Sequence, residues 1–210
     1  MIEQKLKNNY EVVLYMGKNF SCNNTSGKRK ESDYYPTPFE LTRRFLKVWN
    51  IHQNKKILEP ACGEALAIVK VLQEQGFSNI TFHDLHVDNV NFLNEQEQYD
   101  YVITNPPFSL AYEFIQKCKE IVTNEFALLL PLSYLHGKKR YDDIWMDKSF
   151  PLKKVYIFTR YPMLGDELRE DGKMRTGMMV YAWYVWDKNY KGNPEIDWID
   201  INDCILKSKQ

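Results

Sequence analysis

Alternation of apolar runs with amphipathic segments predicts that strands and helices follow one another along this chain. Several runs rich in β-branched and aromatic residues are too short for helices, so we expect strands there. They cover residues 56–60, 79–85, 99–104, 126–132, 153–160 and 180–187, and residues 195–201 can add an edge strand. The run 126–132 is almost continuously apolar, which is typical of a central strand buried on both faces.

Helical spacing appears between these runs. A first helix follows Thr37, Pro38 and Glu40, which have the spacing of a capping box with proline at the first helical position. Its inner face carries Leu41, Phe45, Val48 and Trp49. A second helix is expected over residues 66–75, closed by Gly76. A third begins after Phe108, with Ser109 as its cap and with Phe114, Ile115 and Cys118 facing inward.

This alternation predicts an α/β fold with a mostly parallel sheet. The strands at 153–160 and 180–187 are expected to form a terminal antiparallel hairpin. Residues 85–99 leave little room for a strand and a helix, so a third strand there should be short or missing. We expect an N-terminal extension over residues 1–33, partly mobile, and a single domain over 34–210 without a separate target-recognition domain.

Composition narrows the class of protein. Apolar residues make up 44% of 210 residues, no stretch is long enough to span a membrane, and no secretory signal is recognisable. The four cysteines have neither metal nor disulfide spacing, so we expect no metal and a cytoplasmic location. A formal net charge of zero counts mildly against DNA binding, although local basic patches can serve. Oligomeric state is not predictable from the sequence.

Candidate chemistry lies in the loop Asn105-Pro106-Pro107-Phe108, which follows the strand at 99–104. The prolines must end the ladder and stiffen the loop at a carboxyl edge, where ligands bind in open α/β sheets. The Asn105 side-chain oxygen and the Pro106 carbonyl can each accept one hydrogen of a planar amino group. Phe108 can stack on a flat base. The alternative is a proline-terminated loop in which Asn105 only forms a turn.

The tetrapeptide resembles the signature of amino-group methyltransferases, above all the adenine-N6 DNA methyltransferases, and the similarity covers roughly residues 33–201. It is closest to small, phage-type enzymes of this family. The resemblance implies a doubly wound, Rossmann-like sheet with helices on both faces and S-adenosylmethionine as methyl donor. It also implies adenine in DNA as substrate, with Asn105, Pro106, Pro107 and Phe108 as the catalytic loop.

The same resemblance assigns residues to the methyl donor. Tyr35, Pro36 and Thr37 would close over its methionine end, whose carboxylate a helix start can attract. Glu59, Pro60, Ala61 and Gly63 would form the donor-binding turn, although Ala65 replaces the family's last glycine. Asp84, followed by Leu85, is expected to accept from the ribose hydroxyls. Asn91 and Phe92 would meet the donor's adenine, with Asn91 in place of the usual acid.

Cations suggest where a nucleic acid would lie. Lys138, Lys139 and Arg140 follow a predicted strand and could contact phosphates, or could simply begin a solvated helix. Arg169, Lys173 and Arg175 belong to a long charged connection between the last two strands. Two other functions stay open. One is methylation of RNA adenine or protein glutamine, and the other is a catalytically degenerate binding protein.

Overall fold

The computed structural model describes residues 37–159 and 180–200. The predicted extension, the site residues Tyr35 and Pro36, and the cations Arg169, Lys173 and Arg175 lie outside the described residues.

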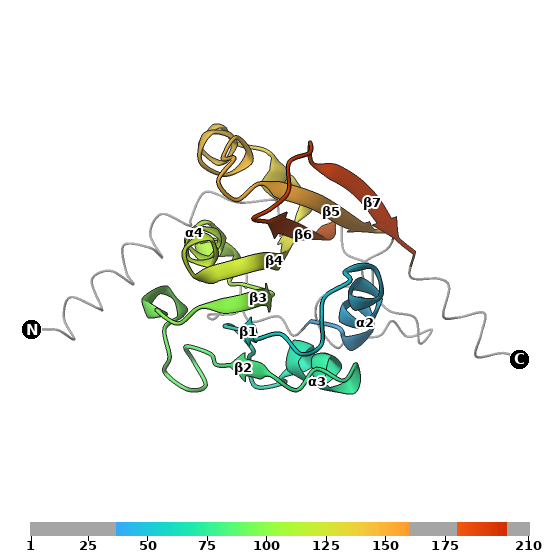
Figure 1. Cartoon of the computed structure of the whole chain (residues 1–210), viewed down its shortest axis with the longest axis vertical. Helices are drawn as coiled ribbons and strands as arrows, with labels where there is room; N and C mark the ends of the chain where they lie inside the picture. The colour runs from blue at the N-terminus through green and yellow to red at the C-terminus, as the bar shows by residue number, and fades with distance from the viewer. Residues whose placement is uncertain (1–36, 160–179, 201–210) are drawn as a thin grey trace, which may run out of the picture.

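The described residues form one seven-stranded sheet in the order β2-β1-β3-β4-β6-β5-β7 (Figure 1). β6 is antiparallel to β4 and to β5, whereas the other neighbouring strands are parallel. The predicted terminal antiparallel pair and the edge strand are therefore confirmed. The strands are β1 (Ile57–Glu59), β2 (Ile80–Phe82), β3 (Tyr99–Thr104), β4 (Val122–Pro131), β5 (Leu152–Phe158), β6 (Tyr181–Asp187) and β7 (Glu195–Ile199).

Helices cover both faces of this sheet. α2 (Phe39–Val48) and α3 (Ala67–Glu74) lie on one face, and α4 (Ala111–Ile121) lies on the other (Figure 1). Central strand β4 contributes to the core on both faces of the sheet, because successive side chains of a strand point to opposite faces. Phe126, Leu128 and Leu130 pack in the core beneath α4, while Ala127 and Leu129 pack beneath α2 and α3. The fold is thus the predicted doubly wound α/β sheet.

Helix starts differ from prediction. Pro38 is the N-cap of α2 and no side chain caps this helix, so the predicted capping box is wrong. Its inner face is partly as expected, with Phe45 buried, but Val48 is 44% exposed. Ser109 does not cap α4 either, because a 3-10 helix (Phe108–Leu110) precedes it. In both places the rigid prolines shift the start of the helix and move the polar side chain away from the free N–H groups.

The second helix and the missing strand are as predicted. Gly76 follows α3 with a φ of 88°, the left-handed conformation that closes a helix. Between β2 and β3 the chain forms a short 3-10 helix (Phe92–Asn94) and no strand. β2 is therefore an edge of the sheet.

Candidate active site

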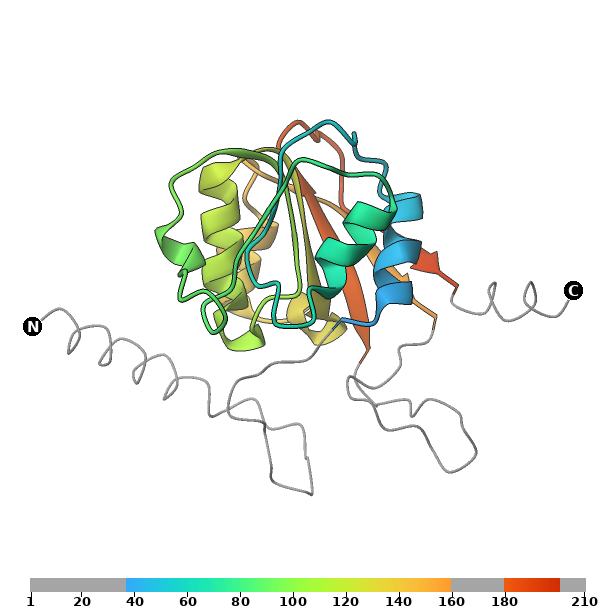
Figure 2. The same cartoon turned by 90° about the horizontal axis from the view of Figure 1, so that it is seen from below.

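Several chain segments meet at one edge of the sheet. β1 and β3 are parallel neighbours, but the chain passes from β1 outward to β2 before it returns to β3 on the other side. Such a switch point is where open α/β sheets bind ligands, at the carboxyl ends of the strands. Figure 2 shows the strands from the side, between α4 and the α2–α3 layer. β1 leads here to Glu59, β2 to Asp84 and β3 to Asn105.

Asn105 is partly exposed and its amide has a defined neighbour. Its Nδ2 donates a hydrogen bond to Thr37 Oγ1 across 3.1 Å. Pro106 is buried, and Pro107 is the N-cap of the 3-10 helix, with its carbonyl accepting from the Leu110 N–H. Among the described residues, no backbone N–H is hydrogen-bonded to the Pro106 carbonyl. The loop therefore holds an amide bonded to Thr37 next to a proline carbonyl, and the role of these two groups as acceptors stays a prediction.

Phe108 has one face covered. Its ring stacks on Tyr181, the first residue of β6, with ring centroids 5.5 Å apart and planes inclined by 30°. Tyr181 was not singled out from the sequence, because it lies far along the chain in an aromatic strand. The antiparallel direction of β6 brings its first residue to the carboxyl edge of β4. A flat ligand therefore cannot stack on the face that Tyr181 covers.

Glu59 is a fully buried carboxyl at the end of β1. One of its oxygens accepts from the Ala61 N–H across 3.0 Å. Burial raises the pKa of Glu59 to about 8; the Thr104 hydroxyl and the Ala61 N–H oppose this increase, and Asp84 adds to it. The group is therefore largely protonated at neutral pH. Pro60, next to it, is buried as well, whereas Ala61 is partly exposed.

Asp84 is hydrogen-bonded both to the turn after β1 and to the turn after β2. Its Oδ2 accepts from the Gly63 N–H across 3.0 Å and its Oδ1 accepts from the His86 N–H across 2.7 Å. Gly63 has a φ of 56°, which favours glycine, and Leu66 has a φ of 51° just before α3. A carboxylate has about four acceptor positions, so these bonds leave room for further donors. The structure thus places Gly63 and Asp84 in direct contact, while their role in binding a donor stays a prediction.

Residues 85, 91 and 92 were predicted to contact the methyl donor, but two of them contact other protein groups in the structure. Leu85 is partly exposed. Asn91 Oδ1 accepts from the Leu93 N–H across 3.0 Å and so begins the 3-10 helix. Phe92 is buried in the core, with its ring centroid 4.7 Å from that of Phe114. Both residues therefore have structural partners, which the sequence resemblance did not indicate.

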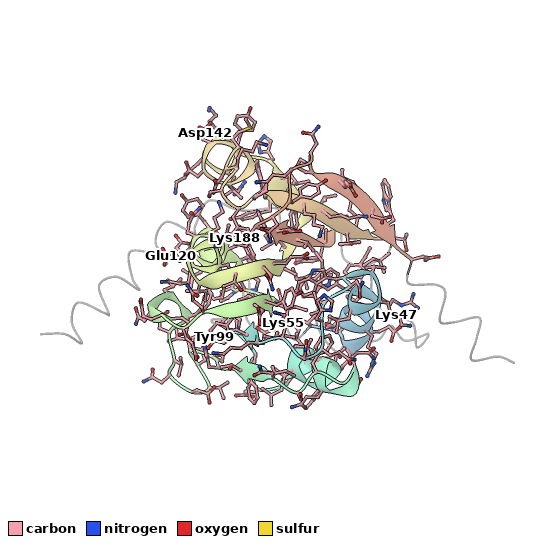
Figure 3. The ribbon with its side chains drawn as sticks, in the orientation of Figure 1. Lys47, Lys55, Tyr99, Glu120, Asp142 and Lys188 are labelled. Atoms are coloured by element: carbon pink, nitrogen blue, oxygen red, sulfur yellow. The ribbon has the colours of Figure 1, made fainter. Side chains whose placement is uncertain are left out.

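The basic run lies beyond the carboxyl end of β4, after a 3-10 helix (Leu132–Leu135). It forms the short helix α5 (Lys138–Arg140), which continues into a π-helix (Tyr141–Trp145). Lys138 Nζ is 2.6 Å from Asp142 Oδ2, and Figure 3 places Asp142 on this outer helical segment. Lys139 Nζ is 3.6 Å from the centroid of the Tyr112 ring, and Arg140 lies over Tyr134. Lys138 Nζ also lies 5.5 Å from the centroid of the Tyr141 ring, so all three cations lie over aromatic rings.

Cys62 stands inside the turn between Glu59 and Gly63. Burial raises the pKa of its thiol to about 12, and the nearby carboxyls of Glu59 and Asp84 add to this effect. It is therefore a neutral thiol rather than a nucleophile. Among the described residues, no group of three His, Cys, Asp or Glu side chains could hold a metal ion. No described helix is long and apolar enough to cross a membrane.

Comparison with known proteins gives the fold. No protein-family model and no curated protein matches the sequence. A solved protein of Listeria monocytogenes, described as a class I S-adenosylmethionine-dependent methyltransferase, is similar with a TM-score of 0.55 and 14% identity. The match covers 88% of this chain and 73% of that one.

Two modification subunits of type I restriction systems are also similar. The methyltransferase subunit from Streptococcus thermophilus gives a TM-score of 0.52 at 12% identity, over 79% of this chain and 47% of that one. The Vibrio vulnificus subunit gives 0.50 at 16% identity, over 95% and 52%. This chain thus spans about half the length of these subunits. At such identities the likeness establishes the Rossmann-like methyltransferase fold.

Proposed function

We propose that this protein transfers a methyl group from S-adenosylmethionine to the exocyclic amino group of adenine in DNA. The observation that carries the proposal is the position of Asn105-Pro106-Pro107-Phe108 at the end of β3, beside the switch point of the sheet. The fold is that of methyltransferases, and the modification subunits among the similar structures act in restriction systems. The proposal joins this fold to the chemistry of the loop.

The methyl donor would lie over the turns that follow β1 and β2. Gly63 permits close approach of the backbone, and Asp84 retains acceptor capacity for hydroxyl groups. Thr37, just before α2, contacts Asn105 at this end of the sheet, and Glu59 ends β1 there. The donor supplies an electrophilic methyl group on a sulfonium, and the protein's part is to bind and orient it.

The catalytic loop would act by positioning and by electrostatics. The amine lone pair of adenine is delocalised into the ring, so the amine is a weak nucleophile. Asn105 Oδ1 and the Pro106 carbonyl would each accept one amine hydrogen, which favours a pyramidal nitrogen with its lone pair toward the methyl group. Stacking on the face of Phe108 opposite Tyr181 would hold the base, at about 1–3 kcal/mol. The nitrogen then loses a proton readily once it carries the methyl group.

Label transfer tests this function. The full chain is incubated with methyl-labelled S-adenosylmethionine and with unmethylated DNA, RNA or protein. We expect label in DNA adenine, and we expect Asn105→Ala to lower the rate about 100-fold or more, as for loss of one oriented polar group in other active sites. Asn124→Ala is the matched control. The Asn124 amide donates to Asp100 near the starts of β3 and β4, at the opposite end of these strands from Asn105.

Each other outcome identifies a different function. Label only in RNA or in protein glutamine would show that DNA is not the substrate, while the proposed chemistry of the loop would still apply. Label in DNA at the parent rate after Asn105→Ala would remove the catalytic assignment. If calorimetry detects no binding of S-adenosylmethionine to the parent protein, the chain would be a catalytically degenerate binding protein. This alternative is kept because Asn91 Oδ1 is already bonded to the Leu93 N–H.

A further inference from the structure

A buried hydroxyl contacts the candidate catalytic amide. Thr37 is 5% exposed and stands two residues before α2, and its Oγ1 accepts from Asn105 Nδ2 across 3.1 Å. The two residues are 68 positions apart in the sequence. Helix capping does not account for Thr37, because Pro38 is the N-cap and α2 has no side-chain cap. The hydroxyl is therefore directed at the amide instead of at the helix.

Orientation of this amide decides what it can do. A side-chain amide is planar, with a donor nitrogen on one side and an acceptor oxygen on the other. Holding Nδ2 toward Thr37 turns Oδ1 away from Thr37. A rotation of the amide by a half-turn would exchange the two, and an NH2 group cannot accept a hydrogen from an incoming amine. The proposed chemistry requires the orientation that this hydrogen bond maintains.

We infer that Thr37 is a positioning residue for methyl transfer, acting through the Asn105 amide. This role depends on the proposed function, because it matters only if Asn105 Oδ1 accepts from the substrate. It differs from the donor-binding role expected from the sequence. The two are compatible, since a hydroxyl has one proton to donate and two lone pairs that accept. Thr37 can accept from Asn105 and still donate to a ligand.

Substitution of Thr37 separates these roles. Thr37→Val keeps the shape and removes the acceptor, whereas Thr37→Ser keeps the hydroxyl. At saturating S-adenosylmethionine we expect Thr37→Val to lower kcat about tenfold, equivalent to about 1.4 kcal/mol, and Thr37→Ser to stay close to the parent. The dissociation constant for the donor, measured by calorimetry, reports separately on any contact between this hydroxyl and the donor, because kcat at saturation does not depend on donor affinity. Thr42→Val on α2 is the control, because its buried hydroxyl has no hydrogen-bond partner among the described residues.

A double substitution tests whether Thr37 acts through Asn105. In an Asn105→Ala background Thr37→Val should cause no further loss, because the amide that it orients is gone. An additive loss would overturn the inference. So would a parent-like kcat for Thr37→Val, or weaker donor binding with kcat unchanged. Absence of transfer by the parent protein to any substrate would remove the proposed function, and the role of Thr37 with it.

Discussion

At the residue scale, Glu59 lies in an environment far from that of an ordinary carboxyl group. It is fully buried, and its pKa rises from 4.5 to about 8. The sequence identified Glu59 as a site residue from its place before Pro60, but burial of this carboxyl could not be predicted. It depends on the position of β1 between β2 and β3 in the sheet, which the residues next to Glu59 do not specify.

This shift predicts a dependence of stability on pH. Between pH 4.5 and 8 the carboxyl ionises in the unfolded chain but stays protonated in the folded protein, so the folded state binds more protons. Its contribution to the free energy of unfolding is therefore present at low pH and is lost as the pH rises toward 8. Glu59→Gln removes this loss. From pH 5 to pH 8, the variant should gain stability relative to the parent by about 4 kcal/mol at most.

Urea unfolding of both proteins at pH 5 and pH 8 measures this difference. Glu64→Gln is the control, because that side chain is exposed on the same turn. Equal effects of Glu59→Gln at both pH values would contradict the raised pKa.

At the element scale, the ends of helices were harder to predict than their existence. Periodicity located α2, α3 and α4, because the face that a helix buries repeats every 3.6 residues. The starts of α2 and α4 were wrong because proline geometry, and not the nearest polar side chain, sets them. The end of α3 was right because glycine is the residue that a left-handed closing conformation favours.

That closing glycine gives a stability prediction. Gly76→Ala should lower the free energy of unfolding by about 1–2 kcal/mol, since an L residue at positive φ is strained. The new Cβ would also lie 3.1 Å from Gln53 Nε2. Urea unfolding measures the loss. In a Gln53→Ala background the contact is absent, so any loss that remains belongs to the backbone, and a complete recovery would assign the effect to crowding instead.

At the scale of the whole molecule, aromatic packing joins the helical layer to the sheet. Trp183 in β6 is fully buried, and the Phe45 ring of α2 stacks on it with centroids 4.5 Å apart. Trp198 in edge strand β7 is 63% exposed. The sequence predicts both as aromatic strand residues, but only their places in the sheet distinguish a core residue from a surface one.

These two tryptophans form a matched pair. Trp183→Ala should lower the free energy of unfolding by about 3–5 kcal/mol, the usual cost of emptying such a site in a core. That is a large part of the roughly 5–15 kcal/mol that holds a typical domain together. Trp198→Ala should change it by only about 0.5 kcal/mol. Denaturant midpoints measure both, and similar losses for the two variants would contradict this division of core and surface.

Local order along the chain determined the alternation of strands and helices, the missing strand after β2 and the stiff loop at Asn105. These features depend only on residues close together in the sequence, through hydrophobic periodicity and the restricted backbone of proline. Tertiary structure alone decided that Thr37 contacts Asn105, that Asp84 bonds Gly63 and that Tyr181 covers one face of Phe108. Each of these pairs joins residues more than twenty positions apart. Only the register and direction of the strands bring them to one edge, and no short-range pattern encodes that register.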